Sequence, residues 1–376
     1  MSAESHRGDG TDRSVAILGA LTHDHPANED PAAGFGHPTH QGFAESVGAD
    51  PIGFETAVGP PLDATMLGDV LTCLRRPSTI PEYDVYITEN SRLLYAVPFV
   101  KAAHPDATVV YLATDYILYG MNCYALDRSL GSLPKYVDRR VEVALLRSLA
   151  RRYVDAAVAA SPFAADFVRP FLGSETPIRT VAPFVQPSVF DRLGAVDPDL
   201  DSQRVVFVGN EIADCKGVDL LVAAWETVRE RFPDARLTIV GGGHPPEYDE
   251  RPGVDLRGFV DHTDLPEVLA AHALYVQPSR VDPHPVSALE ALRAGLPVVA
   301  THTTGTREEV RAVDPSLVVD PTADAIAGGI VSYLSRTRDA RQRLSERARE
   351  RGARFDKESA QAAFRRAFEG VLADAA

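Results

Sequence analysis

The sequence predicts an α/β protein with two doubly wound parallel sheets, one in each half of the chain. Short apolar runs alternate with longer amphipathic segments along most of the 376 residues, which is typical of strand–helix units in a parallel sheet. A stretch rich in proline and aspartate, near residues 182–200, interrupts this alternation about halfway. The hydrophobic content of 45% is sufficient for two domains that each have a core.

In the first half, strands are expected where apolar and β-branched residues run together between polar or glycine-containing segments. Helices are expected between them. The segment 136–153 has apolar residues at helical spacing and an arginine-rich opposite face. That face is either simply solvated or a contact for acidic lipid headgroups. The expected strands are residues 14–21, 84–88, 107–113, 155–161 and 178–182, and the expected helices are 93–103, 136–153 and 162–172.

A long loop rich in proline, glycine, histidine and aspartate is expected over residues 22–42, after the first strand. In an α/β protein this loop borders the ligand cleft, and Gly34 and Gly36 in it allow close approach of the backbone to a ligand. The loop also carries four histidines, at 23, 25, 37 and 40. Their spacing matches no defined metal motif, so a solvated loop or contacts with an acceptor are favoured over a metal site.

The second alternation begins at residue 204, and the chain ends in a mostly helical region. Its expected strands are residues 204–209, 235–240, 254–260, 274–277, 296–300 and 317–320, and its helices follow them. The predicted organisation is a flexible lead over 1–13, a first domain over 14–185, a linker over 186–203, a second domain over 204–355, and a last helix over 356–376 that crosses back to the first domain.

The most informative stretch is residues 277–305, QPSRVDPHPVSALEALRAGLPVVATHTTG. It predicts a strand end, a loop, a helix that starts at Pro285, and a second buried strand. A helix N-terminus just beyond a strand presents unpaired N–H groups and a partial positive charge, which suit a phosphate. Asp282 and Glu290 flank this position, eight residues apart. We expect them to accept hydrogen bonds from hydroxyls of the same ligand.

A second phosphate-binding element is expected in the loop after the strand at 204–209. Lys216, one of only four lysines, follows Gly209 and Asn210 in this loop and precedes a helix. A positive charge at the carboxyl end of a parallel strand is where an α/β protein binds phosphate. The alternative is an ordinary surface lysine at a turn. The stretch over residues 277–305 makes this alternative less favoured, because it predicts a second phosphate-binding element further along the same chain.

Three further positions are candidates for the wall of the same site. The glycine run that ends at Gly243 resembles a phosphate-binding turn but lacks the acidic residue and helix of a dinucleotide fingerprint. Thr304 and Gly305 either add N–H groups near the ligand or form an ordinary strand-to-helix turn. Asp115, after the strand at 107–113, is either a turn residue or a contact in the cleft.

The acidic pair and the residues after it resemble the E-x7-E signature of the family 4 retaining glycosyltransferases. These enzymes have the GT-B architecture, two Rossmann-like domains facing across a cleft. Here the signature reads Asp282-x7-Glu290 and continues into Ala-x-x-Ala-Gly-x-Pro-Val-Val-Ala. The sequence departs from the family at four places: Asp282 stands for a glutamate, His284-Pro285 for Phe-Gly, Asn210 for an arginine, and Thr114 for the histidine that often precedes the aspartate at Asp115.

The resemblance implies transfer of a sugar from a nucleotide-diphosphate donor to an acceptor hydroxyl, with retention at the anomeric carbon. Lys216 and the helix start would stabilise the leaving diphosphate, which itself would take the acceptor's proton. Glu290 would hold the ribose, and Asp282 would orient the donor sugar or stabilise an oxocarbenium-like state. The implied catalytic residues are Asp282, Lys216 and Asp115; the implied donor-binding residues are Gly209, Asn210, Lys216, Gly243, His284, Val286, Ser287, Glu290, Thr304 and Gly305; and Gly34 and Gly36 lie on the acceptor side.

This scheme requires neither a metal ion nor a cofactor, and the nucleotide sugar is the donor substrate. The acceptor stays open between a glycan, a lipid-linked molecule and a small metabolite. The enzymatic alternatives are an epimerase or a phosphorylase of the same fold. The non-enzymatic alternative is a degenerate GT-B subunit that binds a partner or an acceptor without turnover.

Charge and composition exclude several other classes of protein. The formal net charge of −15 argues against a general nucleic-acid binder and against a polybasic membrane anchor. The acid-rich, lysine-poor composition fits either a salt-adapted cytosol or the proteome of a high-GC genome. Three scattered cysteines indicate a reducing compartment, and the polar N-terminus is not a signal peptide. No apolar run reaches the ~18 residues of a membrane span. A cytoplasmic protein is expected, peripheral at the membrane if its acceptor is a lipid, and of open oligomeric state.

Overall fold

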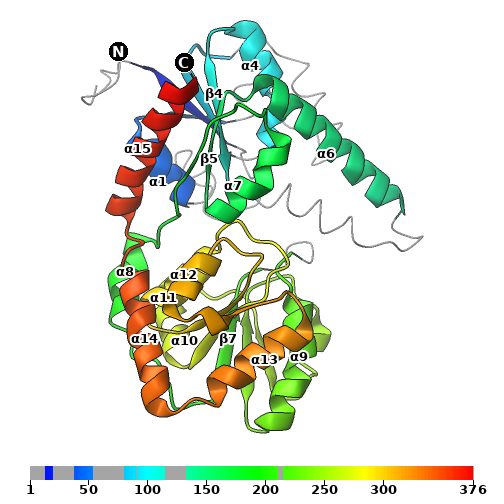
Figure 1. Ribbon diagram of the computed structural model, residues 1–376, viewed down its shortest axis with the longest axis vertical. Coiled ribbons are helices and arrows are strands. Elements are labelled where there is room, and N and C mark those ends of the chain that lie inside the picture. The colour runs from blue at the N-terminus through cyan, green and yellow to red at the C-terminus, as the bar shows by residue number, and fades with distance from the viewer. Residues whose placement is uncertain are drawn as a thin grey trace.

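Two parallel sheets of six strands each organise the computed structural model (Figure 1), which describes residues 13–19, 38–53, 80–89, 91–114, 133–210 and 215–375. The order of the first sheet is β2-β1-β3-β4-β5-β6, and that of the second is β12-β11-β10-β7-β8-β9. Every pairing between these strands is parallel. The predicted α/β fold with two doubly wound sheets is confirmed. The strands are β1 Val15–Gly19, β2 Asp50–Gly53, β3 Val85–Thr88, β4 Thr108–Ala113, β5 Ala156–Ala159, β6 Ile178–Thr180, β7 Arg204–Val208, β8 Arg236–Val240, β9 Val254–Arg257, β10 Leu274–Gln277, β11 Val298–Thr301 and β12 Val318–Val319.

Helices cover both faces of each sheet, so the strands are buried on two sides. In β1 the successive side chains alternate between two apolar clusters: Val15 and Ile17 belong to one, Ala16 and Leu18 to the other. This explains the uninterrupted apolar runs of the sequence. The α-helices are α1 Pro38–Ser46, α4 Val97–Ala103, α6 Leu133–Tyr153, α7 Pro162–Val168, α8 Pro187–Gly194, α9 Val218–Arg231, α10 Leu265–Ala270, α11 Val286–Arg293, α12 Arg307–Val313, α13 Ala323–Leu334, α14 Arg338–Gly352 and α15 Lys357–Ala375, and the 3₁₀ helices are Ser91–Tyr95, Arg169–Phe171, Pro246–Tyr248, His262–Asp264 and Pro315–Leu317.

The chain crosses twice between the two domains, and the two crossings lie against each other. The Val185 N–H donates a hydrogen bond of 2.9 Å to the carbonyl of Phe355 on the returning segment. Helix α15 then packs against α1, β5 and β6 (Figure 1). Its Phe364 stacks on Phe43 of α1, with ring centroids 4.5 Å apart. The core of the first domain is therefore completed by the last helix of the chain.

The structure adds helices to two segments that the sequence leaves without one. The expected loop over 22–42 ends sooner, because helix α1 begins at Pro38, whose fixed φ suits the first turn of a helix. The segment 186–203, expected as a linker, contains helix α8, whose Val189 and Leu193 are buried. The lead over residues 1–12 lies outside the described residues.

The strand orders place one reversal point in each sheet. In the first sheet β1 lies between β2 and β3, and in the second β7 lies between β8 and β10. Open α/β sheets bind ligands outside the carboxyl ends of their strands at such points. The loops after β1, β3, β7 and β10 are therefore the places to look for a site.

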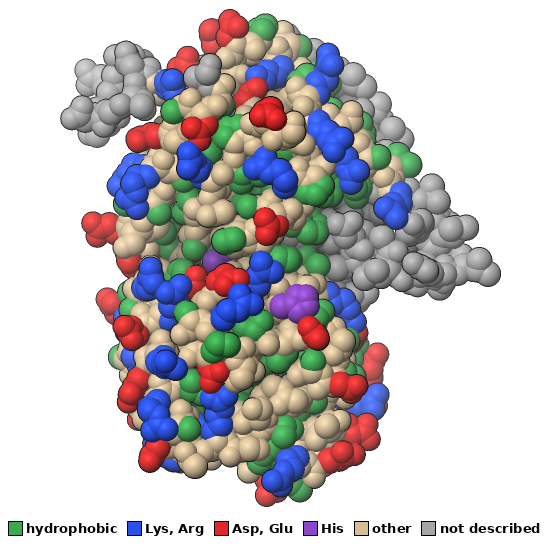
Figure 2. All heavy atoms as spheres, in the orientation of Figure 1, with side chains coloured by type: hydrophobic (Ala, Val, Ile, Leu, Met, Phe, Trp, Pro, Cys, Tyr) green, Lys and Arg blue, Asp and Glu red, His purple; other side chains and the backbone are tan. Residues whose placement is uncertain are grey.

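On the face of the molecule drawn in Figure 2, the coloured basic and acidic side chains do not form separate patches. Figure 2 shows basic and acidic side chains interspersed over both domains, among the residues drawn in colour. In the described part of the chain, no helix combines the length and the apolar character needed to cross a bilayer.

Candidate active site

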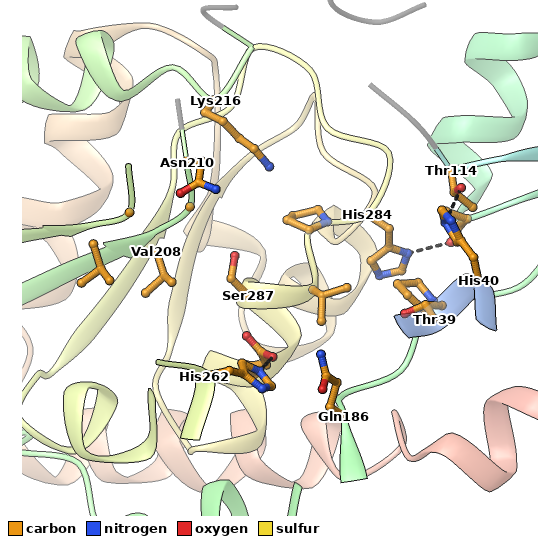
Figure 3. A pocket seen from close by; sticks show the side chains of 18 of the residues that line it. Thr39, His40, Thr114, Gln186, Val208, Asn210, Lys216, His262, His284 and Ser287 are labelled. Carbon is orange, nitrogen blue, oxygen red and sulfur yellow. Dashed lines mark hydrogen bonds and ion pairs between the residues drawn. The ribbon is translucent and has the colours of Figure 1, made fainter. Parts of the chain in front are cut away.

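A cavity of about 680 Å³ lies between the carboxyl edges of the two sheets. Residues of both domains line it (Figure 3): Lys216, Ser287 and Glu290 on the second-domain wall, and His40 and Thr114 on the first-domain wall. The cavity thus lies at the reversal points of both sheets, where this kind of fold binds ligands.

Lys216 reaches the cavity from a loop that packs tightly against the segment after β10. Gly217, the next residue, has a φ of +65°, and a Cβ there would lie 2.2 Å from the carbonyl oxygen of Pro278. The Arg280 N–H also donates a hydrogen bond of 2.8 Å to the Cys215 carbonyl. Only glycine fits this conformation and this close approach, so the sequence Lys-Gly positions the lysine.

Lys216 forms a buried ion pair with Asp282. Its Nζ lies 2.9 Å from Oδ2 of Asp282, and the two side chains are 8% and 0% exposed. Lys216 lines the cavity, but Asp282 is not among the described residues that do so. The structure therefore places Asp282 behind Lys216, and direct contact between Asp282 and a ligand stays a prediction.

The segment around Asp282 is joined to the turn after β11. The Asp282 N–H donates to the Thr303 carbonyl at 3.1 Å, and the Gly305 N–H donates to the Asp282 carbonyl at 2.9 Å. A Cβ on Gly305 would lie 1.7 Å from the carbonyl oxygen of Pro283. Like Asp282, Thr304 and Gly305 are not among the described residues that line the cavity. Their place is behind the wall, where they support the loop.

The start of α11 provides backbone donors at the cavity. Pro285 is the residue before the helix, and no side chain caps the first turn. Val286 and Ser287 line the cavity, so their N–H groups lie where a phosphate would bind. The Ser287 Oγ lies 2.8 Å from the hydroxyl of Tyr275. Burial raises the pKa of Tyr275, which therefore keeps its proton.

Glu290 and His262 form a pair on the same wall. The Nε2 of His262 lies 2.7 Å from Oε1 of Glu290, and both residues line the cavity. The hydrogen bond to Glu290 raises the pKa of His262 above its ordinary value. The sequence predicts Glu290 but not His262, which follows β9 rather than the signature stretch.

The glycine turn after β8 packs against the end of β7. A Cβ on Gly241, whose φ is +134°, would lie 2.2 Å from the carbonyl oxygen of Gly209. The Asn210 Oδ1 accepts a hydrogen bond of 2.8 Å from the Gly242 N–H. Gly209, Asn210 and Gly241 line the cavity, whereas Gly243 is not among the described lining residues. Asn210 thus holds the turn in place, and its contact with a donor stays a prediction.

Phe259 is an apolar side chain that the sequence does not single out. It follows β9, lines the cavity, and is 81% exposed. A large aromatic ring exposed at the edge of a cavity is a surface on which a flat ligand group stacks.

His284 connects the signature loop to the first domain. Its Nδ1 lies 2.7 Å from the Ala160 carbonyl, and the Ser161 hydroxyl donates to the Pro283 carbonyl at 2.7 Å. Because a carbonyl only accepts, the proton of His284 is on Nδ1, which leaves Nε2 as an acceptor. Nε2 has no hydrogen-bond partner in the described part of the chain, and burial lowers the pKa of this ring. His284 therefore offers a neutral acceptor in the cavity wall.

Three polar residues of the first-domain wall form a hydrogen-bonded chain that sequence reasoning missed. The Nδ1 of His40 lies 2.9 Å from Oε1 of Glu89, and its Nε2 lies 2.7 Å from Oγ1 of Thr114. The three residues lie on α1 and directly after β3 and β4. The sequence predicts His40 in a loop and places Glu89 just beyond the strand expected over 84–88. The one signal that could have identified these residues is their common position after strands near the reversal point of the first sheet.

Some predicted positions cannot be placed. Gly34, Gly36 and Asp115 lie outside the described residues, and so do three of the loop histidines, so their roles stay predictions. Among the residues that are described, no group of three or more His, Cys, Asp or Glu side chains is arranged to hold a metal ion.

Residues 202–336 match the family described as glycosyl transferases group 1. Among curated proteins, the chain is 32% identical over 114 residues to mannosylfructose-phosphate synthase from Agrobacterium fabrum, covering 26% of this chain and 25% of the relative. It is also 32% identical over 158 residues to the GDP-mannose-dependent alpha-(1-6)-phosphatidylinositol monomannoside mannosyltransferase of Mycolicibacterium smegmatis, covering 38% of this chain and 41% of the relative. The matches thus span well under half the length of these relatives.

Solved structures show the same architecture over nearly the whole chain. Sucrose-phosphate synthase from Thermosynechococcus elongatus superposes with a TM-score of 0.72 at 18% identity, covering 96% of this chain and 99% of the other. Alr3699/HepE from Anabaena, in complex with UDP-glucose, superposes with a TM-score of 0.63 at 17% identity, covering 95% and 100%. At these identities the likeness establishes the fold, which is GT-B as the signature predicts.

Proposed function

Because residues 202–336 match the family of group 1 glycosyltransferases, we propose that the chain is a retaining glycosyltransferase. It moves a sugar from a nucleotide-diphosphate donor to an acceptor hydroxyl. One observation carries the proposal: Lys216, the start of α11 and Glu290 meet on one wall of a cavity whose opposite wall belongs to the first domain. Donor and acceptor therefore bind from opposite walls and meet between the domains.

The diphosphate of the donor binds between Lys216 and the start of α11. Lys216, Val286 and Ser287 line the same cavity. When the bond to the sugar breaks, negative charge grows on the leaving phosphate oxygen. Fixed donors and a cation that are already in place stabilise that charge without reorganisation.

The nucleoside binds further along the second-domain wall. Glu290 accepts hydrogen bonds from the ribose hydroxyls, and the exposed ring of Phe259 stacks on the base. The backbone at Gly209 and Gly241 carries no side chain, so it allows the nucleotide to lie close. Each of these residues lines the cavity.

The donor sugar lies beside the loop that carries His284. Pro283 and Pro285 have no N–H, so between them only His284 supplies a backbone donor. The Nε2 of the His284 ring, which has no hydrogen-bond partner among the described residues, accepts a hydrogen bond from a sugar hydroxyl. Asp282 acts on the same site through Lys216, whose ammonium it holds. No metal ion and no cofactor take part in this scheme.

The proposal is tested by calorimetric titration of UDP and GDP, followed by transfer assays with UDP-glucose and GDP-mannose on glycan, glycolipid and small-molecule acceptors. We expect one nucleotide to bind and Phe259→Ala to weaken it by about 1–3 kcal/mol, the usual loss for a stacked base. Val141, an exposed apolar residue of α6, is the control: Val141→Ala leaves binding unchanged. NMR of the product shows whether the anomeric configuration is retained.

Three outcomes would contradict the proposal in whole or in part. Binding of a nucleotide without transfer to any acceptor or to water would indicate a subunit that binds but does not turn over. Failure of UDP and GDP to bind, followed by failure of nucleoside diphosphates with the other bases, would remove the donor site altogether. An inverted product would leave transfer in place but exclude retention.

The His262–Glu290 pair predicts a pH-dependent contribution to stability. Since the hydrogen bond to Glu290 raises the pKa of His262 above its ordinary value, His262 stabilises the fold fully below about pH 6.5. This contribution is lost as the pH rises through the raised pKa. His262→Gln should therefore cost up to about 1 kcal/mol at pH 6 and almost nothing at pH 9. Urea unfolding at both values measures this. An equal loss at the two pH values would exclude the ionic contribution. His302→Gln, which removes an exposed pair with Asp320, is the control.

A further inference from the structure

The pair of His262 and Glu290 places an imidazole inside the proposed donor site. The Nε2 of His262 lies 2.7 Å from Oε1 of Glu290, and the two side chains are 33% and 7% exposed. Both residues line the cavity, and Figure 3 shows His262 among the side chains that do so. A carboxylate has acceptor sites on both oxygens, so Glu290 can accept from His262 and from a ribose hydroxyl at the same time. Imidazole is the side chain whose charge changes near neutral pH.

The backbone that carries His262 is held on both sides of the ring. The Asp261 carboxylate accepts hydrogen bonds from the Thr263 N–H at 2.8 Å and from the Thr263 hydroxyl at 2.7 Å. The Arg192 guanidinium of α8 donates to the Thr263 carbonyl at 2.6 Å. These bonds hold the 3₁₀ helix His262–Asp264 in place, so the imidazole is presented to Glu290 by a fixed segment.

The charges on the second-domain wall do not balance while His262 is neutral. Of the described second-domain residues that line the cavity, Lys216 and Glu290 are the ones with charged side chains besides the histidines. The charge of Lys216 is already compensated by Asp282, 2.9 Å away. His284 is buried, which lowers its pKa and keeps it neutral. Glu290 therefore leaves a negative charge in excess near the place where a diphosphate binds, unless His262 is protonated.

The other charged groups around His262 are carboxylates and guanidinium groups. The 3₁₀ helix His262–Asp264 packs against α8 and α10, and its histidine pairs with Glu290 of α11. The hydrogen bond to Glu290 is the main reason why the pKa of His262 is raised, and the charges of Glu290 and Asp261 act in the same direction against the desolvation of the ring. The charged side chains of these elements are Asp191, Arg192, Asp261, Asp264, Glu267, Glu290 and Arg293.

We propose that His262 compensates Glu290 as an imidazolium when the donor binds, so that binding of the nucleotide sugar takes up a proton. The inference rests on the proposed transferase function and adds a pH-dependent donor affinity to it. A carboxylate only accepts, so Nε2 already carries a proton in the neutral ring, and the proton taken up from solvent goes to Nδ1. His262 is thus a positioning residue that acts on the donor through Glu290.

The affinity for the donor is expected to fall as the pH rises. The anionic diphosphate favours the imidazolium, so the pKa of His262 is higher in the complex than in the free protein. Affinity is then highest below the pKa of the free protein and lowest above that of the complex. If the two differ by about one unit, the affinity falls about tenfold between about pH 6 and about pH 9.

Calorimetric titration with UDP-glucose or GDP-mannose, whichever carries the base that binds, measures this. The diphosphate of a nucleotide sugar is esterified at both ends and has no proton to lose in this range, unlike that of UDP or GDP. Titration at one pH in phosphate and in Tris, which differ in ionisation enthalpy, gives the number of protons taken up. We expect an uptake of up to one proton, largest where the pH lies between the two pKa values of His262.

Two substitutions at His262 separate its charge from its packing. His262→Gln keeps an N–H donor for Glu290 and cannot be protonated, so it should bind at every pH about as weakly as the wild type does at high pH. His262→Arg carries a permanent charge, so it should bind at every pH about as tightly as the wild type does at low pH. A merely structural role would instead weaken both variants equally at all pH values.

His302 provides the matched control. Its Nε2 lies 3.3 Å from Oδ1 of Asp320, so it is also a histidine paired with a carboxylate. Neither residue is among the described residues that line the cavity. His302→Gln should therefore keep the pH profile and the proton uptake of the wild type. All variants keep His40 of the opposite wall, so the difference between the wild type and His262→Gln isolates His262.

The outcomes distinguish this inference from the function on which it rests. If the wild type binds a nucleotide sugar equally well across the pH range and takes up no proton, the role of His262 is wrong while the donor site stands. A pH profile that persists in His262→Gln belongs to another group and also overturns it. If no nucleoside diphosphate or nucleotide sugar binds at any pH, the proposed function fails. Should neither variant fold, the comparison of buffers on the wild type decides, because it needs no variant.

Discussion

Lys216→Met is expected to destabilise the protein by about 3–5 kcal/mol, because it leaves a buried carboxylate without its cation. Asp282 is 0% exposed, and its Oδ2 lies 2.9 Å from the Lys216 Nζ. Asp282→Asn alone leaves a buried cation and is expected to cost a similar amount. The double variant, Lys216→Met with Asp282→Asn, buries no charge at this place and should recover much of the loss.

Urea unfolding of the wild type, both single variants and the double variant gives the coupling free energy of the pair. Lys101, whose Nζ lies 2.7 Å from Oδ2 of Asp155, provides the control, since those side chains are 19% and 36% exposed. Lys101→Met should cost no more than about 1 kcal/mol. If the losses in free energy of unfolding at Lys216 and Asp282 simply add in the double variant, the two side chains do not stabilise the fold as a pair.

The same double variant also separates stability from chemistry. If Lys216 stabilises the leaving diphosphate, the refolded double variant stays inactive, with kcat/KM lower by about 10²–10³-fold, as for the loss of one preorganised donor. A stable and fully active double variant would show that Lys216 serves only to neutralise Asp282.

Gly305→Ala is expected to damage the site through packing alone. Its Cβ would lie 1.7 Å from the Pro283 carbonyl oxygen and 2.5 Å from the Ser161 Oγ. That carbonyl belongs to the loop between Asp282 and His284, so the loop must move. Overpacking of this kind costs about 1–3 kcal/mol, and displacement of a positioning loop by about 1 Å costs about 10²-fold in rate.

Transfer activity and urea unfolding of Gly305→Ala measure the two effects. Gly328, on helix α13, is the matched control, because a Cβ there meets nothing within 4 Å. Gly328→Ala should preserve activity and raise stability by up to about 1 kcal/mol, as expected inside a helix. Wild-type activity and stability in Gly305→Ala would show that the loop is not held by this contact.

The fold was predictable because its signals are local. The apolar run that became β11, Val298–Thr301, reads directly as a buried strand, and the glycine and proline before it end helix α11. Lys216 and Glu290 were predictable for a related reason, since each belongs to the loop or helix that follows a recognisable strand. The structure then places both in the lining of the cavity. Periodicity and turn residues carry this information without knowledge of the tertiary structure.

The first-domain wall could not be predicted in this way, because its groups meet only through the strand order. His40 and Thr114 are 74 positions apart in the sequence, yet their side chains are 2.7 Å apart. His40 stands in no motif, and Thr114 stands where the family's cleft motif is not matched. The burial of Asp282 was equally hidden, since it depends on the turn at Gly305 closing over the loop. Both features follow from long-range packing rather than from residue type.

The return of α15 to the first domain has a consequence for the order of folding. The rings of Phe43 and Phe184 pack edge to face near α1, and Phe364 of α15 stacks on Phe43. A ribosome makes α15 only after the whole second domain. The first domain, although synthesised first, cannot bury this part of its core until then, whereas domains generally fold as units in the order of their synthesis. In this chain the second domain is the one able to complete its core without waiting for a distant segment.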